Sequence, residues 1–232
     1  MKTEENSSQE PASQSLGVAA RPEPAVCRDL SEDDALALVN QKSLSAEALA
    51  SIARTPIASK SRKVSFTLVT HARTPRHLAI PLLRRMFTFD LLKVALSPPA
   101  AADLKRVAEE QIILRLEALT VGERISLARR SPSRVVAALL ADRDMRVLTT
   151  ALGNPRLREA SVTQALMRAD APAILFEKLS EHPTWSKRRE VQIALLASEK
   201  TPFDAARQLA RRFPAKRLEE ILPESRRALI EA

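Results

Sequence analysis

The sequence contains very little of what turns, strands and phosphate-binding loops are made from. Among its 232 residues there are three glycines and no tyrosine, and aromatic residues make up 3% of the chain. Hairpins, barrels and glycine-turned α/β loops depend on these residue types. Their scarcity argues against β-rich folds and against glycine-rich nucleotide-binding folds.

Cysteine and long apolar runs are also scarce. The single cysteine, Cys27, stands in a polar segment, so the chain offers neither a disulfide framework nor a thiolate metal site. No uncharged apolar run of about eighteen residues occurs. Residues 1–30 lack the continuous apolar stretch of a secretory signal. We therefore expect a cytoplasmic protein without a transmembrane segment.

What the chain does contain favours helices. Ala, Leu and Arg dominate, and 45% of the residues are hydrophobic, which is enough to fill a core. Pairs of a polar residue and proline recur along the sequence. In most of these pairs we expect the polar side chain to cap the coming helix and proline to take its first position. The pairs are Thr55-Pro56, Thr74-Pro75, Ser97-Pro98, Ser131-Pro132, Asn154-Pro155, His182-Pro183 and Thr201-Pro202.

One stretch of the sequence occurs twice. RKVSFTLVTHARTPRHLAIPLLRRM, residues 62–86, aligns without a gap with REVQIALLASEKTPFDAARQLARRF, residues 189–213, at an offset of 127 residues. The match extends backward to Ala48 and Leu175, and a weaker third copy surrounds Pro132 and Pro155. Repeated helical pairs that bury their apolar faces on one another indicate a solenoid.

The segment NPRLREASVTQAL, Asn154 to Leu166, and the Thr-Pro helix starts resemble bacterial HEAT-like and leucine-rich-variant helical repeats. The resemblance covers about residues 45–222. It implies an all-α fold, a right-handed α-solenoid of stacked antiparallel helical pairs. Within 29–232 we expect approximate units at 45–95, 100–170 and 172–222. A helix of about twenty residues, within 98–120, interrupts the array.

Charge divides the chain into two parts. Residues 1–40 carry three basic and eight acidic side chains, whereas residues 41–232 carry 34 basic and 20 acidic ones, a net charge of +14. Residues 1–28 are polar and acidic, so we expect a disordered tail, with structure beginning at a capping Ser31. The basic part suits an anionic partner, although an Arg-rich composition with a solvated surface also accounts for it.

No residues point to catalysis. His71, His77 and His182 have no further ligands at metal spacing, and we expect His182 at a helix cap. There is no nucleophile motif and no phosphate loop. Glu109, Glu110 and Glu117 fit a solvated helix face, and Thr120 with Glu123 fits a capping box. The prediction is a non-enzymatic protein without cofactor or metal.

Basic residues recur at matched positions of the two copies. Arg84-Arg85 and Arg211-Arg212 fit the last turn of a helix, where cations are favourable. A second set should lie near helix starts, where positive charge is mildly unfavourable, and it forms our candidate binding site: Lys60, Arg62, Lys63, Lys187, Arg188 and Arg189. Lys60 and Arg62 match Lys187 and Arg189, whereas Lys63 matches Glu190, and the second copy adds Arg188. Either Arg62 and Arg189 reach carboxylates on adjacent helices, such as Asp90 or Glu219-Glu220, or the set binds an anion.

Trp185 is the single tryptophan and corresponds to Ala58 in the first copy. It either covers the end of the core or anchors an interface, since tryptophan is enriched in binding hot spots. Together these features predict a scaffold that binds a protein partner, and the net positive charge favours an acidic one. The alternative is binding to the backbone of duplex nucleic acid through a basic face, although few aromatic residues are available for stacking on bases.

Overall fold

The computed structural model of the protein describes residues 30–41 and 43–230, and all regular structure in this part is helical. The expected disordered tail, residues 1–28, lies outside the described residues. Because every regular element in the described residues is a helix, the all-α prediction is confirmed. None of the described helices combines the length and apolarity needed to cross a bilayer.

The described chain folds into a series of helices, most of them short, that are joined by turns. The first six are α1 (Glu32–Val39), α2 (Ala46–Ala53), α3 (Pro56–Lys60), α4 (Arg62–Thr70), α5 (Arg76–Arg85) and α6 (Thr88–Leu96). The middle part contains α7 (Ala102–Arg115), the 3-10 turn η1 (Leu116–Ala118), α8 (Val121–Arg130), α9 (Ser133–Leu139) and α10 (Met145–Leu152). The last part contains α11 (Glu159–Leu166), α12 (Ala173–Glu181), η2 (Trp185–Lys187), α13 (Arg189–Ala197), α14 (Phe203–Ala210), α15 (Ala215–Ile221) and η3 (Glu224–Ile230).

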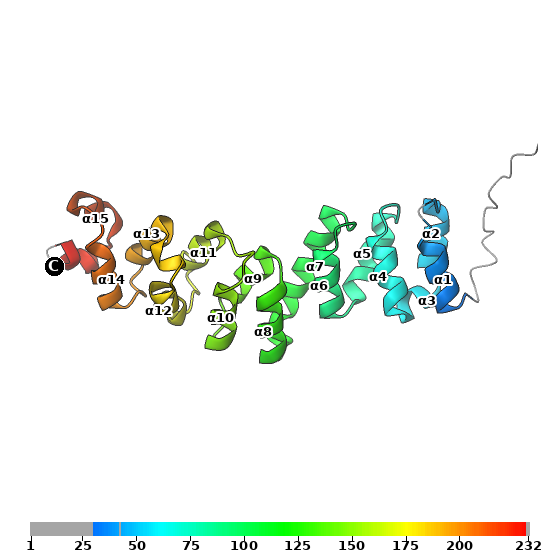
Figure 1. Ribbon diagram of the computed structural model, residues 1–232, viewed down its shortest axis with the longest axis horizontal. Coiled ribbons are helices and arrows are strands. Elements are labelled where there is room, and N and C mark those ends of the chain that lie inside the picture. Colours follow the sequence, from blue (N-terminus) through cyan, green and yellow to red (C-terminus); the bar gives the residue numbers. More distant parts are fainter. Residues whose placement is uncertain (1–29, 42, 231–232) are drawn as a thin grey trace, which may run out of the picture.

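The helices follow one another along the long axis of an elongated molecule, from α1 at one end to α15 at the other (Figure 1). Each packs on helices near it in the sequence, as α6 does on α7 and α8 does on α10. Buried apolar side chains continue from Ala35 in α1 to Leu222 after α15. One core therefore runs the length of the molecule, and no helix can bury its apolar face alone.

The helix starts repeat with the offset seen in the sequence. Helices α1, α2, α4, α5 and α6 begin at residues 32, 46, 62, 76 and 88, and α11 to α15 begin at residues 159, 173, 189, 203 and 215. Each start is displaced by 127 residues. The packing repeats as well, because α1 packs on α4 as α11 packs on α13, and α4 packs on α5 as α13 packs on α14.

Several predicted helix ends are confirmed. The Ser31 hydroxyl accepts from the Asp34 amide at the start of α1, and Thr120 and Glu123 form a capping box on α8. The long helix expected within 98–120 is α7, which has 14 residues and is followed by η1. Arg84 and Arg85 lie in the last turn of α5, whereas Arg211 and Arg212 stand just after α14.

The expected role of the polar residues before proline is wrong. Pro75, Pro132 and Pro202 are themselves the N-caps of α5, α9 and α14. The residue before each of them is buried, and the Thr201 hydroxyl donates to the carbonyl of Leu195 in the preceding helix at 2.6 Å. A residue before proline is held in an extended conformation, which here turns its side chain back toward the core. The hydroxyls of Thr55 and Thr201 bind the helix that ends and do not cap the one that begins, whereas those of Thr74 and Ser131 are buried without a hydrogen-bond partner in the described chain. Pro56 takes the first position of α3, as expected.

Cationic side chains bind backbone carbonyls of the preceding unit, either at the end of a helix or in the loop that follows it. Arg115 donates to the carbonyls of Met86 and Arg84 at 2.6 and 2.7 Å, at the end of α5. Lys200 donates to those of Ala169 and Ala171, both at 2.8 Å, after α11. In the same way Arg156 reaches Arg130, and Arg73 reaches Ser43 and Leu44. We call Arg73, Arg115, Arg156 and Lys200 the carbonyl clamps.

The carbonyl clamps are regularly spaced. Successive members stand 42, 41 and 44 residues apart, and 127 is close to three times this spacing. Each clamp stands at or just after the end of the first helix of a group of three, the helices α4, α7, α10 and α13, and Arg115 is itself the last residue of α7. This spacing is shorter than that of the units expected from the sequence.

Removing a carbonyl clamp should destabilise the stack of helices. We expect Arg115→Ala to lower the free energy of unfolding by about 1 to 3 kcal/mol, because two carbonyls at the end of α5 lose a charged donor. The matched control is Arg106→Ala, which removes an exposed arginine of the same helix whose partner is Glu110 at 3.6 Å. This control should cost less than about 0.5 kcal/mol. Urea unfolding followed by circular dichroism measures both free energies. Equal losses in the two variants would show that the bonds of Arg115 to the carbonyls stabilise the fold no more than an exposed ion pair does.

Candidate functional site

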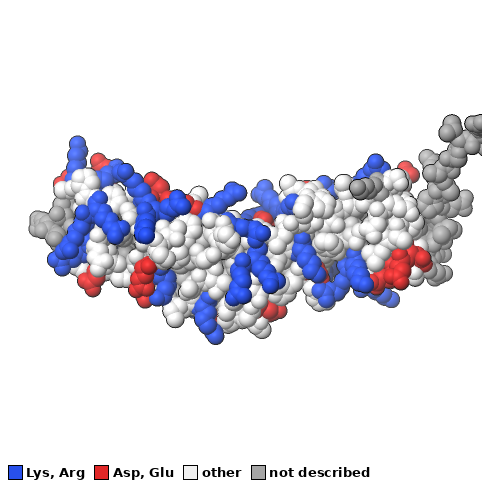
Figure 2. Space-filling model, viewed as in Figure 1, with Lys and Arg blue, Asp and Glu red and all other residues white. Residues whose placement is uncertain are grey.

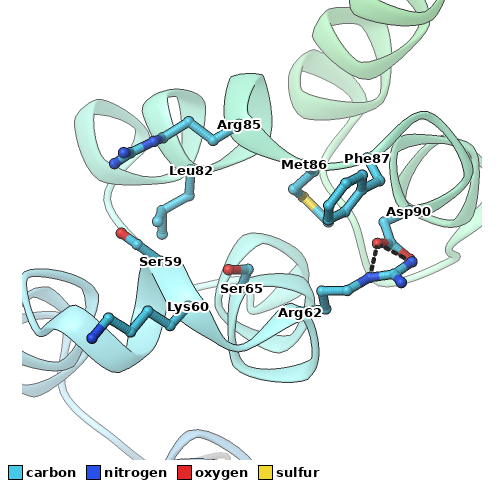
Figure 3. A pocket seen from close by; sticks show the side chains of 9 residues that line it. All are labelled: Ser59, Lys60, Arg62, Ser65, Leu82, Arg85, Met86, Phe87 and Asp90. Carbon is cyan, nitrogen blue, oxygen red and sulfur yellow. Dashed lines mark hydrogen bonds and ion pairs between the residues drawn. The ribbon is translucent and has the colours of Figure 1, made fainter.

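A small hollow lies where α3, α4, α5 and the start of α6 meet (Figure 3). Its volume is about 60 Å³, enough for water or a small oxyanion group. It brings together two of the predicted site residues, Lys60 and Arg62. The lining residues are Ser59, Lys60, Arg62, Ser65, Leu82, Arg85, Met86, Phe87 and Asp90.

The two ends of the hollow differ in charge. Lys60 from α3 and Arg85 from α5 both extend toward one end, on opposite sides of the Ser59 side chain, while Arg62 and Asp90 meet at the other (Figure 3). Lys60 is the last residue of α3, and Arg85 is the last of α5. Both are exposed, and neither has a carboxylate partner among the described residues. The sequence analysis had explained Arg85 by the helix dipole alone and so missed it as a lining residue.

Arg62 is neutralised at the other end. Its Nε and Nη2 lie 2.8 and 2.7 Å from Asp90 Oδ2, and its guanidinium lies over the Phe87 ring, 4.8 Å from the centroid. Asp90 is buried and also accepts from Lys93 at 3.1 Å. This confirms the expectation that Arg62 pairs with a carboxylate on an adjacent helix.

Equivalent glutamates bind different cations in the two copies. Glu32, which opens α1, pairs with Lys63 at 3.5 Å, and Glu159, which opens α11, pairs with Arg188 at 3.7 Å. All four side chains are on helix starts or immediately before them. Lys63 and Arg188 therefore have structural partners.

Arg189 does not form the predicted pair. Position 90 of the first copy corresponds to Arg217 in the second, so the carboxylate that holds Arg62 has no counterpart. Glu220, one of the carboxylates expected to serve Arg189, pairs instead with Arg217. Among the described residues Arg189 has no ion-pair partner, and neither does Lys187.

The helical positions of two predicted site residues also differ from expectation. Lys60 and Lys187 were expected near helix starts, but they are the last residues of α3 and η2. The sequence pattern placed one helix where the chain makes a short helix, a break and a second helix. A lysine at the end of a helix faces the negative end of the dipole, so its position costs no stability.

Trp185 belongs to the core. The side chain is 8% exposed, and its indole Nε1 donates to the carbonyl of Leu152 at 2.9 Å, at the end of α10. Its counterpart Ala58 is buried too. An anchor for a partner must be accessible in the free protein, so the interface role is a correction to the sequence analysis, and the role of covering the core stands.

His71 and His182 accept hydrogen bonds from backbone amides in the turns that follow them. His182 is the C-cap residue of α12, as expected, and its Nδ1 accepts from the amides of Thr184 and Trp185 at 3.2 and 3.3 Å. Burial lowers its pKa. His71 accepts from the Arg73 amide in the same way. Within the described ranges no three His, Cys, Asp or Glu side chains are grouped as metal ligands would be.

A second, wider hollow near α8 and α10 has charges that are already balanced. Arg124 pairs with Asp142 at 3.2 Å. Asp144 is held by Arg146 at 2.9 Å, and this hydrogen bond lowers the pKa of Asp144 to about 2. Since these charges bind one another, the hollow between α3 and α6 is the better candidate for an external anion.

Comparison of the chain with protein-family models, with curated proteins and with solved structures finds no match.

Replacing Trp185 should affect stability first. We expect Trp185→Ala to lower the free energy of unfolding by about 3 to 5 kcal/mol, because it leaves a large cavity between η2 and α10. Trp185→Phe keeps most of the packing and loses the hydrogen bond to Leu152, for a cost of about 1 to 2 kcal/mol. Chemical denaturation measures both. Wild-type stability in the Ala variant would contradict the assignment of Trp185 to the core.

The pair at the hollow should respond asymmetrically to mutation. Arg62→Gln leaves a buried carboxylate with one partner fewer, and we expect a loss of about 1 to 2 kcal/mol. Asp90→Asn leaves an exposed guanidinium that water can solvate, so its cost should stay under about 1 kcal/mol. Urea unfolding at neutral pH compares them. A larger loss in the Asp90 variant would refute this explanation of the pair.

Proposed function

We propose that the chain is a HEAT-like, right-handed α-solenoid that acts as a non-enzymatic scaffold and binds an acidic segment of a protein partner. The solenoid part of this proposal is supported by the elongated row of helices, the core that continues along it and the regular spacing of the carbonyl clamps. Stacked repeats offer long surfaces for binding other proteins.

The carrying observation is that the exposed residues of the described chain include both unpaired arginines and large apolar side chains. At the ends of α5, α8 and α14 stand exposed arginine pairs whose side chains form no hydrogen bond or ion pair within the described chain: Arg84 and Arg85, Arg129 and Arg130, Arg211 and Arg212. Basic groups occur along the whole length of one face, on which acidic ones are fewer (Figure 2). Exposed apolar residues include Phe87, Leu114, Met145, Met167 and Phe203.

This mixture favours a protein partner over nucleic acid. Phe, Met and Arg are enriched in protein interfaces, whereas contacts with a phosphate backbone are made mainly by charged and polar groups. Leu114 and Met167 are 76% and 78% exposed and have nothing to offer a phosphate backbone. Binding to duplex DNA is the outcome that the following experiment would reveal if the proposal is wrong.

Two exposed apolar residues allow a direct test. The chain is immobilised, an extract is treated with nuclease, and retained proteins are identified. We expect an acidic protein to stay bound to the immobilised chain after nuclease treatment and to be released when salt is added. Leu114→Ser or Met167→Ser should reduce its retention severalfold without changing the stability of the chain, because both side chains are largely exposed.

The control is a gel shift with a 30-base-pair duplex at low salt, as a probe for backbone binding. Loss of all retained protein after nuclease treatment, together with a shift of this duplex that both serine variants preserve, would replace the scaffold proposal with nucleic-acid binding.

A further inference from the structure

The two copies of the sequence keep some exposed charges and reverse others. Charge is reversed between Arg54 and Glu181, between Lys63 and Glu190, and between Lys93 and Glu220. It is kept at five other exposed pairs. One is Arg73 and Lys200, which are carbonyl clamps in both copies, and the others are Lys60 and Lys187, Arg62 and Arg189, Arg84 and Arg211, Arg85 and Arg212. Folding therefore tolerates either sign at many exposed sites, and the retained cations need a separate reason.

The fold supplies only part of that reason. The helix dipole favours any cation at the end of α5, so it accounts in part for Arg84 and Arg85. The bond to Asp90 accounts for Arg62 in the first copy but has no equivalent for Arg189. The dipole likewise favours a cation at Lys60 and Lys187, the last residues of α3 and η2, but it does not explain why the serine before each lysine is repeated as well. Both lysines lack an ionic partner among the described residues.

Three retained residues meet at one place in the structure. Ser59, Lys60 and Arg85 line the same end of the hollow, and the two cations extend in the same direction (Figure 3). The carboxylate that lines the hollow, Asp90, lies at the other end and is occupied by Arg62 and Lys93. Two like charges that line one hollow repel each other, and an anion that binds both would reduce this repulsion.

We propose that Ser59, Lys60 and Arg85 form a binding site for an oxyanion group, and that Ser186, Lys187 and Arg212 form a second one. A lysine, an arginine and a hydroxyl supply several hydrogen-bond donors and two positive charges, the combination that carboxylate and phosphoryl groups accept. The ligand is a carboxylate group in the acidic segment of the partner, and its identity rests on the proposed scaffold function.

The second site differs in detail from the first. Gln192 stands in the place of Ser65, and its amide donates to the backbone carbonyl of Ser186 at 2.7 Å. Arg217 and Glu220 stand in the places of Asp90 and Lys93 and pair with each other, so this exchange leaves the net charge unchanged. The second copy therefore keeps Ser186, Lys187 and Arg212 but changes the residues that surround them. Two sites in one chain bind an acidic segment that is long enough to span them more tightly than either site alone.

Peptide binding tests the sites. Fluorescence anisotropy of a fluorescein-labelled decaglutamate peptide is measured with the full chain and with Lys60→Gln/Arg85→Gln and Lys187→Gln/Arg212→Gln variants. The matched control, Arg54→Gln/Lys216→Gln, also removes one arginine and one lysine, one from each copy, at positions where the charge is not retained. We expect each site variant to weaken binding about tenfold and the control less than about twofold. Circular dichroism verifies that all variants are folded.

A competition experiment distinguishes a site from general attraction. Inorganic phosphate should displace the peptide better than chloride at equal ionic strength, because it can accept the hydrogen bonds of the site. Equal displacement by chloride, or equal losses in the control and the site variants, would overturn the proposal. If a captured protein partner binds the site variants normally, the sites are wrong and the scaffold function stands. If the peptide binds in a way that depends on the sites but no protein is captured from the extract, the proposed sites are supported and the proposed scaffold function is refuted.

Discussion

The structure depends on how its many helix ends are closed. A helix leaves its last carbonyls without partners, and a row of short helices has such an end every ten residues or so. Glycine is the residue that most often closes these ends, yet this chain has three glycines, and Gly153 after α10 has a φ of −80°. The clamps Arg115 and Arg156 bind such carbonyls at the ends of α5 and α8, while Arg73 and Lys200 bind carbonyls in the loops after α1 and α11. Because each donor comes from the following unit, binding these carbonyls and stacking the next unit are one event.

Part of this architecture can be predicted from the sequence. Caps such as Ser31 and the box of Thr120 with Glu123 depend on neighbours within one helical turn, and the sequence places them correctly. The Arg62–Asp90 pair was also found, because a repeated arginine at a helix start needs a carboxylate nearby. The clamps and the hydrogen bond of Trp185 to Leu152 were missed, since each bond joins residues about thirty positions apart and exists only when units stack.

The clamps also change the meaning of the basic composition. Arg73, Arg115, Arg156 and Lys200 are bound to backbone carbonyls, and Arg62 is bound to a buried carboxylate, so these cations serve the fold. Lys60 and Arg85, and their counterparts Lys187 and Arg212, have no such partner within the described residues. Sequence alone does not separate the two groups, because both consist of cations near helix ends. The structure separates them by what their donors touch.

Hydrogen exchange of the full chain with and without the decaglutamate peptide tests this division most directly. If the unbonded cations form the ligand sites, the peptide should slow exchange around the ends of α3 and α5 and in the matched segment around η2 and the end of α14. Exchange in α8 to α10 should stay unchanged. Protection confined to α8 to α10, or spread evenly over the chain, would contradict the division of the basic residues into those that hold the fold and those that bind.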